Sequence, residues 1–439
     1  MKTNLTAACL VAANEDRDSA RISSLRGNKN NKALLFLASL WTLMAPAQAK
    51  ADPTLFDYKT MRPLGKIQDM VLSDENKMFA LKTAGAKIGD TEYPIWVGNS
   101  DNLASAFSSS WTTNAAPSCA FFKNKLYIAP KTETNYLYRA DVGNGQLPKI
   151  GSAERLNLSN SDGSPVRMQA PYLYATDKNL YAIENAQNGP NVHILAENGN
   201  GLRVTKSLAL ENYNGVSFQK EQIKDIVSTR AGDQDFLYIL TTNGQENANL
   251  WLVRGNRGEY SAWEPTFLYI TPPQWKNDTY YTPLFDHTTS IAVHCGRLLT
   301  ANANYKHQGD SLRQMGRAFS LSSEGEPNYP GNNSFDETTY YRQSDTFRTS
   351  AIGSDQSKYY AEAIDSQDNS MDPNLNKYFI QGQLEYKNFY EDGTYYDYST
   401  PRTGEPVYKF TTRKEGEIFA ISPSSIYRIK DSDRSSSGF

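Results

Sequence analysis

Three of the four histidines lie close together in the chain, at His287, His294 and His307, with Cys295 beside the second. Imidazole and thiolate are ligands that zinc prefers, and a catalytic zinc site needs three protein ligands. Structural zinc sites use short spacings, whereas His287 and His294 differ by seven positions. That odd offset places them on opposite faces if one strand carries both. We therefore expect neither a metal site nor a bound cofactor.

Two further patterns resemble functional motifs but lack residues that the corresponding chemistry requires. Gly309-Asp310-Ser311-Leu312 spells the motif of one esterase family. That chemistry needs a histidine activated by an acid, and no histidine follows the motif, so we expect Ser311 to be inert. Residues 365–372 are rich in acids but lack the glycine and the terminal glutamate of a calcium loop. We expect a solvated hairpin loop there.

A repeat along the chain predicts the elements that would position any site. Seven times, a short polar turn is followed by a pair of apolar residues, as in Asn124-Lys125-Leu126-Tyr127 and Asp235-Phe236-Leu237-Tyr238. The last residues of these segments are separated by 48, 54, 57, 61, 61 and 59 positions. The 28 Tyr and 18 Phe favour strands. A period of this size in an all-strand chain predicts a β-propeller.

The repeat predicts an all-β fold, a seven-bladed β-propeller whose units each hold an apolar first strand, a second strand at the repeated segment and a third strand. Fourth strands are expected at residues 107–112, 202–210 and 264–270. The seventh unit ends after its third strand, while residues 54–58 form a spare strand before the first unit. We expect this N-terminal strand to complete the last blade and close the ring, the alternative being that it packs as a loop.

One repeat resembles the repeat of bacterial and fungal propeller lectins. Its residues are Ala116-Pro117-Ser118-Cys119-Ala120-Phe121-Phe122-Lys123-Asn124-Lys125-Leu126-Tyr127. Ala170-Pro171-Tyr172-Leu173-Tyr174, with Leu180-Tyr181, is a fainter copy. The resemblance covers about two repeats of seven and implies a lectin-like, carbohydrate-binding propeller. The chain lacks the near-identical sites that such lectins repeat around the ring.

The N-terminal segment predicts export. An uncharged apolar run at residues 33–44 ends in Ala47-Gln48-Ala49, a small-residue cleavage pattern. Residues 1–49 therefore read as a signal peptide, residues 50–430 as one propeller domain and residues 431–439 as a polar tail. The mature chain would be secreted or periplasmic, with no transmembrane segment; retention of the segment as an anchor is the alternative.

Charge indicates which partners to expect, and cysteine content indicates whether disulfides form. Residues 1–49 hold six Lys/Arg and three Asp/Glu of the chain's 45 and 48, so the mature chain has 39 basic and 45 acidic residues, a net charge of −6. Without a basic stripe, nucleic acid is not an expected partner. Cys119 and Cys295 fall in units two and five, so we expect two free, buried thiols.

No catalytic constellation is complete, so the sequence favours a secreted binding protein whose ligand is a carbohydrate or a protein. Sugars stack on aromatic rings, with charged and amide groups bonding their hydroxyls. The candidate ligand-binding residues are Trp96, Trp111, Arg139, Trp251 and Trp263. The alternative is a hydrolase or lyase that acts on polysaccharide with carboxylates, Tyr or His at one mouth of the ring.

Overall fold

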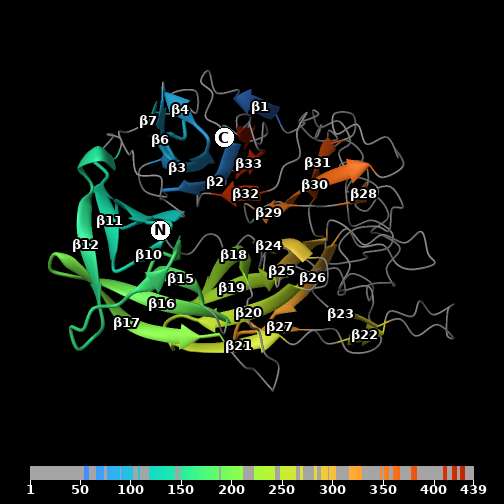
Figure 1. The fold of residues 1–439 in the computed structure, drawn as a ribbon. Coiled ribbons are helices and arrows are strands. Elements are labelled where there is room, and N and C mark those ends of the chain that lie inside the picture. The colour runs from blue at the N-terminus through green and yellow to red at the C-terminus, as the bar shows by residue number, and fades with distance from the viewer. Residues whose placement is uncertain are drawn as a thin grey trace, which may run out of the picture. The chain divides into compact units, whose positions relative to one another are not determined.

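The computed structural model describes most of residues 54–430. Residues 1–53 and 431–439 lie outside the described part. Its gaps of more than five residues are 59–65, 109–117, 211–221, 270–280, 303–315, 329–346, 366–376 and 383–408. Leu55–Lys430 is one compact unit of the chain. Its regular elements are strands and one turn of 3₁₀ helix, so the described part of the protein is all-β (Figure 1).

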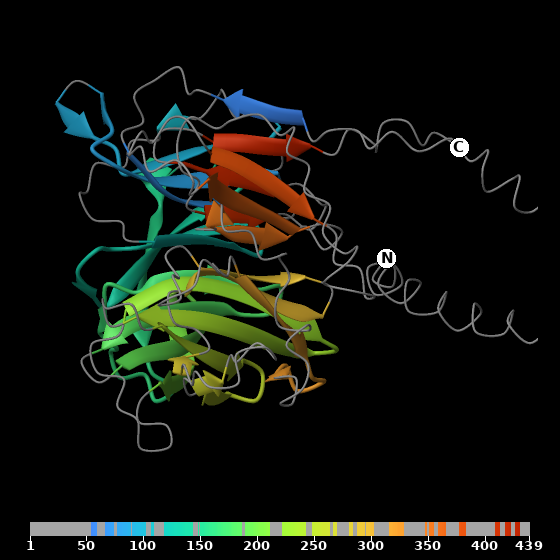
Figure 2. The ribbon, with the colours of Figure 1, turned by 90° about the vertical axis from the view of Figure 1, so that its right-hand side faces the viewer.

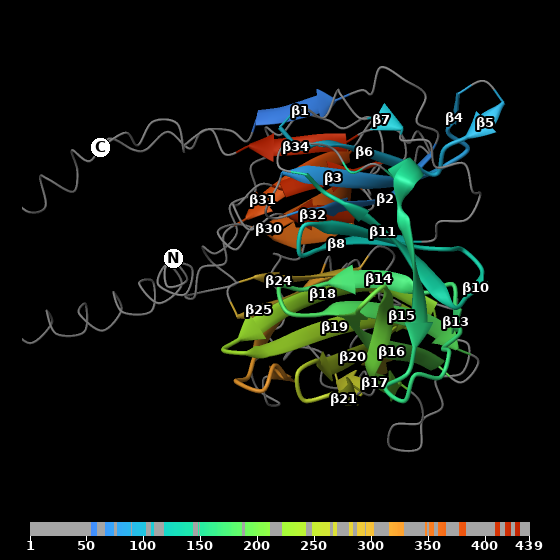
Figure 3. The same ribbon diagram turned by 90° about the vertical axis from the view of Figure 1, so that its left-hand side faces the viewer.

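Units one to three are antiparallel sheets in which consecutive strands pair. Unit one has the order β2-β3-β6-β7, with bounds Lys66–Leu72, Met78–Ala84, Ile95–Asn99 and Phe107–Ser108. Unit two holds β8 (Ser118–Phe122), β9 (Lys125–Ala129), β11 (Tyr136–Asp141) and β12 (Glu154–Ser159). Unit three holds β14 (Tyr172–Ala175), β15 (Leu180–Ala186), β16 (Gly189–Asn198) and β17 (Gly201–Ala209), of which β14, β15 and β16 are seen side by side in Figure 3.

Units four and five continue this pattern. Unit four has the order β18-β19-β20-β21, with bounds Gln222–Ala231, Gln234–Thr242, Ala248–Arg254 and Glu259–Trp263. Unit five has the order β24-β25-β26-β27, with bounds Thr288–His294, Arg297–Asn302, Gly316–Leu321 and Pro327–Asn328.

The last two units depart from this simple strand order. In unit six, β30 (Tyr359–Asp365) pairs with β29 (Ile352–Ser354), β31 (Lys377–Gly382) and β28 (Phe347–Arg348). Unit seven holds β32 (Lys409–Thr412), β33 (Ile418–Ile421) and β34 (Ile426–Lys430). The N-terminal β1 (Thr54–Tyr58) neighbours β34 in the order β1-β34-β33-β32, and Figure 2 shows it in blue beside the red strands.

Short elements complete the description. Three two-stranded pairs are β4 (Lys87–Ile88) with β5 (Thr91–Glu92), β10 (Glu133–Thr134) with β13 (Met168–Gln169), and β22 (Phe267–Tyr269) with β23 (Tyr281–Pro283). The 3₁₀ turn η3 spans Ile150–Ser152. These lie between the larger strands of the units in sequence.

The second strands form the packed interior because they bury both faces. β19 is buried from Asp235 to Thr241. Its alternate side chains enter two different hydrophobic clusters: Tyr238 packs with residues of β24 and β25, whereas Ile239 packs with residues of β15 and β16. Successive side chains of a strand point to opposite faces, so one apolar run fills the space on both sides of its sheet. This explains why the repeated segment is apolar without alternation.

The structure confirms strands at the positions predicted for the first three strands of the units. Two features of the fourth strands differ from the prediction. The fourth strand of unit four is β21, not the predicted 264–270, since the turn at Gly255–Gly258 returns the chain to the sheet earlier. Units two and three also share one eight-stranded sheet through a parallel pairing of β12 with β17. An ideal Cβ at Gly201 would lie 3.0 Å from the carbonyl oxygen of Asn157. Glycine therefore permits this close approach.

A hydrogen bond from the tyrosine of a second strand to the next unit recurs three times, and we call it the tyrosine latch. Tyr127 of unit two donates to Glu197 of unit three. Tyr181 of unit three donates to Asp235 of unit four, over 3.2 Å. Tyr238 of unit four donates to the carbonyl of Gly325, over 2.6 Å. The tyrosine that marks the repeat therefore also joins neighbouring units.

Gly255 is required by one tyrosine latch. A Cβ at this position would overlap the hydroxyl group of Tyr181 and lie 3.4 Å from Cβ of Asp235. We expect Gly255→Ala to lower the free energy of unfolding by about 2 kcal/mol, because the methyl group overpacks the site. Urea unfolding measures this loss. In a Tyr181→Phe background, which removes the hydroxyl, the same substitution should cost less; an equal cost in both backgrounds would place the strain elsewhere.

Candidate functional site

Two of the predicted ligand-binding tryptophans lie in the packed interior. Trp96 on β6 and Trp251 on β20 are 1% and 0% exposed. The Trp96 indole N–H donates to the carbonyl of Tyr93, and that of Trp251 donates to Oγ1 of Thr241. In this structure both indoles therefore pack between sheets and present no ring to a sugar. Trp111 lies outside the described residues. Trp263, on β21, pairs with Leu250 of β20, but its side chain is not described, so the role of both tryptophans stays a prediction.

Arg139 belongs to an ion-pair network between units two and three. Its guanidinium contacts Glu154 at 2.5 Å and Glu197 at 2.9 Å, and Lys125 reaches Glu197 at 2.8 Å. Arg254 and Arg428 of the third strands β20 and β34 likewise pair with acids of neighbouring units, Glu326 at 2.7 Å and Asp101 at 3.6 Å. Arg139 thus takes part in joining units; ligand contact by this residue stays a prediction.

The same network gives a pH dependence. Partial burial opposes ionisation of Glu197, but hydrogen bonds from Lys125, Tyr127 and Arg139 outweigh it and lower the pKa of Glu197 to about 2. The unfolded pKa is about 4.3, so the stabilisation is complete above that value and is lost as pH falls toward the folded pKa. We expect the melting-temperature difference between wild type and Glu197→Gln to close between about pH 5 and pH 2. Glu259→Gln, at an exposed carboxylate, is the control, and a pH-independent difference would contradict the assignment.

The candidate site is a group of polar side chains on the first strands, which we call the first-strand cluster: Asp69 on β2, Tyr172 and Tyr174 on β14, Asp225 on β18 and Lys409 on β32. All five lie within the first four residues of their strands. Lys409 and Tyr172 are the first residues of theirs, and Asp69 and Asp225 the fourth. The cluster therefore brings together the starts of first strands that lie far apart in sequence.

Asp69 is the centre of the cluster. Its Oδ1 lies 2.5 Å from Nζ of Lys409 and accepts the N–H of Met70, while its Oδ2 accepts the hydroxyl of Tyr172 over 3.2 Å. Burial alone would lower the pKa of Lys409, but Asp69 in particular raises it well above its ordinary value. Burial and the nearby Asp69 charge raise the pKa of Tyr172. Lys409 is thus charged, and Tyr172 keeps its hydroxyl hydrogen and donates it.

Asp225 repeats this arrangement in unit four. Its Oδ1 accepts the N–H of Ile226, and its Oδ2 accepts the hydroxyl of Ser290 and the N–H of Ile291 over 2.8 and 2.9 Å. Both aspartates directly follow an extra, bulged residue in the pairing of first and second strands. A bulge re-aims the side chain beside it; the carboxylate of Asp69 reaches β14 and β32, and that of Asp225 reaches β24. Burial raises the pKa of Asp225.

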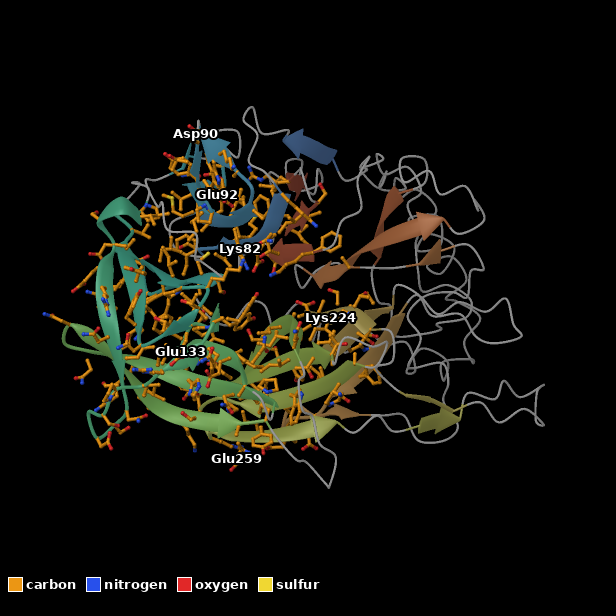
Figure 4. The ribbon with its side chains drawn as sticks, viewed as in Figure 1. Lys82, Asp90, Glu92, Glu133, Lys224 and Glu259 are labelled. Carbon is orange, nitrogen blue, oxygen red and sulfur yellow. The ribbon has the colours of Figure 1, made fainter. Side chains whose placement is uncertain are left out.

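Lys82 lies beside this cluster without an ion pair among the described residues. It is directly opposite Asp69 in the pairing of β2 with β3, and Figure 4 labels it there. Burial lowers the pKa of Lys82; Asp69 and Cys119 oppose this shift, while the like charges of Lys131 and Lys409 add to it. Lys82 therefore has two like charges and only one carboxylate, that of Asp69, among its charged neighbours, which gives a local excess of positive charge.

Cys119, on β8 next to Lys82, is buried and free. Burial and the Asp69 carboxylate raise its pKa to about 12. Because only the thiolate is an effective nucleophile, we expect iodoacetamide to leave Cys119 unmodified in folded protein and to alkylate it in urea, as read by peptide mass. Labelling of the folded protein at the rate of an exposed cysteine would contradict this burial. The free thiol predicted at Cys119 is confirmed; Cys295 lies outside the described residues.

Other candidates from the sequence cannot be placed. His287, His307 and the motif at residues 309–312 lie outside the described residues, and the side chain of His294 is not described. Within the described part of the chain, no three His, Cys, Asp or Glu side chains gather as metal ligands would. No helix in that part is both long and apolar enough to cross a bilayer.

The first-strand cluster was not predicted from the sequence, although a signal for it exists. Ile67-Gln68-Asp69-Met70 and Ile223-Lys224-Asp225-Ile226 place an acid at the same point of two apolar first strands. A charge inside such a strand needs a partner when buried. That partner, Lys409 for Asp69, comes from the far end of the chain and is not visible in local sequence.

Comparison with family models and with curated protein sequences gave no match. Solved structures that align with most of this chain include β-propellers, with TM-scores below 0.5. The propeller domain of Myceliophteria thermophila Cps50 (Swd1) has a TM-score of 0.46 at 11% identity, over 86% of this chain and 99% of that one. The WD40 propeller of Doa1 has 0.42 at 9%, over 84% and 94%. YCF48 bound to a D1 peptide has 0.44 at 10%, over 85% and 96%. Lectin specificity stays a prediction.

Proposed function

We propose that this chain is a secreted seven-bladed β-propeller, closed by β1, that binds an acidic segment of a partner protein. Contacts between first strands support the ring: β2 with β8, β8 with β14, β18 with β24, β24 with β29, β29 with β32, and β32 with β2 again. Between β14 and β18, the Tyr174 hydroxyl lies 2.9 Å from Oγ of Ser228. A series of contacts that returns to its first member is what a ring requires.

Secretion is proposed from the N-terminal sequence alone. The apolar run at residues 33–44 and the small residues at 47–49 have the order of a signal peptide. N-terminal sequencing of protein exported from its host tests this: a mature chain that begins at Lys50 supports the proposal, and a retained residue 1 contradicts it.

The observation that carries the binding proposal is the local charge excess at Lys82. The charged neighbours of Lys82 are Lys131, Lys409 and Asp69, and the carboxylate of Asp69 is already engaged by Lys409 and Tyr172. Neither Lys82 nor Lys131 forms an ion pair within the described part of the chain. A carboxylate from a partner would supply the counter-charge, and such charge-assisted hydrogen bonds are about twice as strong as neutral ones.

The opposite ends of the first strands differ, because their charges are neutralised within the protein. Lys125, Arg139, Glu154 and Glu197 form one network there. Asp101 is shared by Lys77 and Arg428, and Asp233 by Lys178 and Arg230. An acidic partner therefore finds fewer available cations at those ends, which favours the Lys82 end as the binding side.

A direct test uses a fluorescent hexaglutamate peptide and its hexaglutamine counterpart with the mature protein. We expect the acidic peptide alone to bind, with an affinity that falls as salt rises and about tenfold in Lys82→Ala, for a loss of about 1.4 kcal/mol. Lys206→Ala is the matched control, because Lys206 is an exposed lysine on β17 that donates to the carbonyl of Arg257. Equal binding of both peptides, or no effect at Lys82, would overturn the proposal.

Carbohydrate recognition and polysaccharide cleavage remain predictions from the sequence. The buried Trp96 and Trp251 do not add support for sugar stacking. Asp69 and Asp225 are both occupied as hydrogen-bond acceptors, so the cluster does not add support for a pair of catalytic carboxylates. A glycan array scored for both retention and cleavage by the mature protein tests the two alternatives together.

A further inference from the structure

Ser207, His193 and Glu184 form a hydrogen-bonded relay across three neighbouring strands of unit three. His193 on β16 is paired directly with Ser207 on β17, and Glu184 on β15 lies diagonally across from His193. Nδ1 of His193 is 2.8 Å from Oγ of Ser207, and Nε2 is 3.2 Å from Oε1 of Glu184. Ser207 is exposed, whereas the other two are buried. The relay therefore runs from the interior to the surface.

The contacts of Glu184 determine which ring nitrogen of His193 donates a hydrogen bond and which accepts one. Burial opposes ionisation of Glu184, but hydrogen bonds from His193, the N–H of Gln169 and Nδ2 of Asn191 outweigh it and lower its pKa. An ionised carboxylate can only accept hydrogen bonds, so Nε2 of His193 must donate. In the neutral imidazole, Nδ1 is then the acceptor. Ser207 must therefore donate its hydroxyl hydrogen to His193.

We propose that Ser207 is a nucleophile activated by His193, a site separate from the proposed binding side. In the reaction, Oγ of Ser207 forms a bond to an acyl carbon and its proton passes to Nδ1 of His193. Glu184 stabilises the resulting imidazolium through Nε2, as an acid does in other serine nucleophile sites. The bond from the acyl carbon to the leaving group breaks, and the leaving group takes the proton from Nδ1, which returns His193 to its neutral form. Water then releases the acid, its proton passing through His193 back to Ser207.

The substrate class follows from the surroundings of Ser207. It lies on an outer strand where the parallel neighbour β12 pairs only with residues 201–203 of β17. Ser207 and its chain neighbour Lys206 are both exposed, so the surroundings keep little water from an oxyanion formed there. The rate of acyl transfer to Ser207 then depends on how easily the leaving group departs. Small aryl esters and thioesters have such leaving groups and fit this site, whereas peptides do not.

Covalent labelling with a fluorophosphonate tests the nucleophile, since the phosphorus forms a bond to the serine oxygen and fluoride leaves. We expect one adduct in intact mature protein, located on Ser207 by peptide mapping, and none in Ser207→Ala. His193→Gln should slow labelling about 100-fold, the usual contribution of a general base. Glu184→Gln should slow it about tenfold while melting stays cooperative, because Glu184 acts only by orienting His193.

Ser161→Ala is the control variant, because Ser161 is an exposed serine whose hydroxyl donates to the carbonyl of Val204 over 3.3 Å. Its labelling rate should equal that of wild type. Ser207 is exposed, so Ser207→Ala should fold even if a substitution at buried His193 does not. An unlabelled wild type, an adduct on another serine, or a folded His193→Gln that labels at the wild-type rate would each overturn the proposal.

Discussion

Asp69→Ala should lower the free energy of unfolding by about 3 kcal/mol, because it leaves the ammonium of Lys409 without its nearest counter-charge. The side chains of Asp69 and Lys409 are only 16% and 26% exposed. The substitution also removes the acceptor of the Tyr172 hydroxyl. Since Asp69, Tyr172 and Lys409 come from units one, three and seven, the loss should weaken contacts among all three. Urea unfolding of the mature protein measures it.

A double-mutant cycle with Lys409→Met separates the ion pair from the packing. Methionine keeps most of the apolar stem, so the double variant should recover part of the Asp69→Ala loss, with a coupling energy of about 1 kcal/mol or more. Strict additivity would show that the pair contributes nothing. Because the pKa of Lys409 is raised, its stabilisation is complete below about 10.4, the ordinary lysine value. The difference in unfolding free energy between wild type and Lys409→Met should therefore disappear only at higher pH.

The strands could be predicted from sequence because each unit repeats a local rule. An apolar second strand after a polar turn must bury both faces, and this pattern is present at Leu126, Leu180 and Leu237, all buried in the structure. Outer strands were less predictable. Gly255–Gly258 ends unit four's third strand with a turn that moves the fourth strand to Glu259–Trp263, and the β12–β17 pairing depends on the missing side chain of Gly201.

The site could not be predicted because its contacts join distant units. Trp96 and Trp251 were predicted to bind a ligand because they are large aromatic residues, yet large apolar side chains are also typical of the buried interior between sheets. Their hydrogen bonds to Tyr93 and Thr241 are local. Asp69, by contrast, meets Tyr172 and Lys409, which lie 103 and 340 positions away. Pairings at such separations follow from the tertiary arrangement of the sheets and have no counterpart in the spacing of residues.

Deleting residues 52–58 should cost several kcal/mol of unfolding free energy, a large share of the stability of an ordinary domain. The deletion removes β1, which neighbours β34 in the order β1-β34-β33-β32. Without it, β34 becomes an edge strand with unpaired backbone groups. Arg428 of β34, which pairs with Asp101 of unit one, would then be held by a weakened sheet. Differential scanning calorimetry of the two proteins gives the comparison.

A synthetic peptide of residues 50–60 provides the control that distinguishes strand loss from a general truncation effect. If β1 completes the last sheet by backbone pairing, the peptide should restore the melting temperature of the deletion variant, as an added strand does in other proteins. A scrambled peptide of the same composition should not. An unchanged melting temperature on deletion would contradict closure by β1. Rescue by the scrambled peptide would mean that apolar cover, not register, is what β34 needs. Selective rescue would instead identify the N-terminal strand as the part that joins the two ends of the ring.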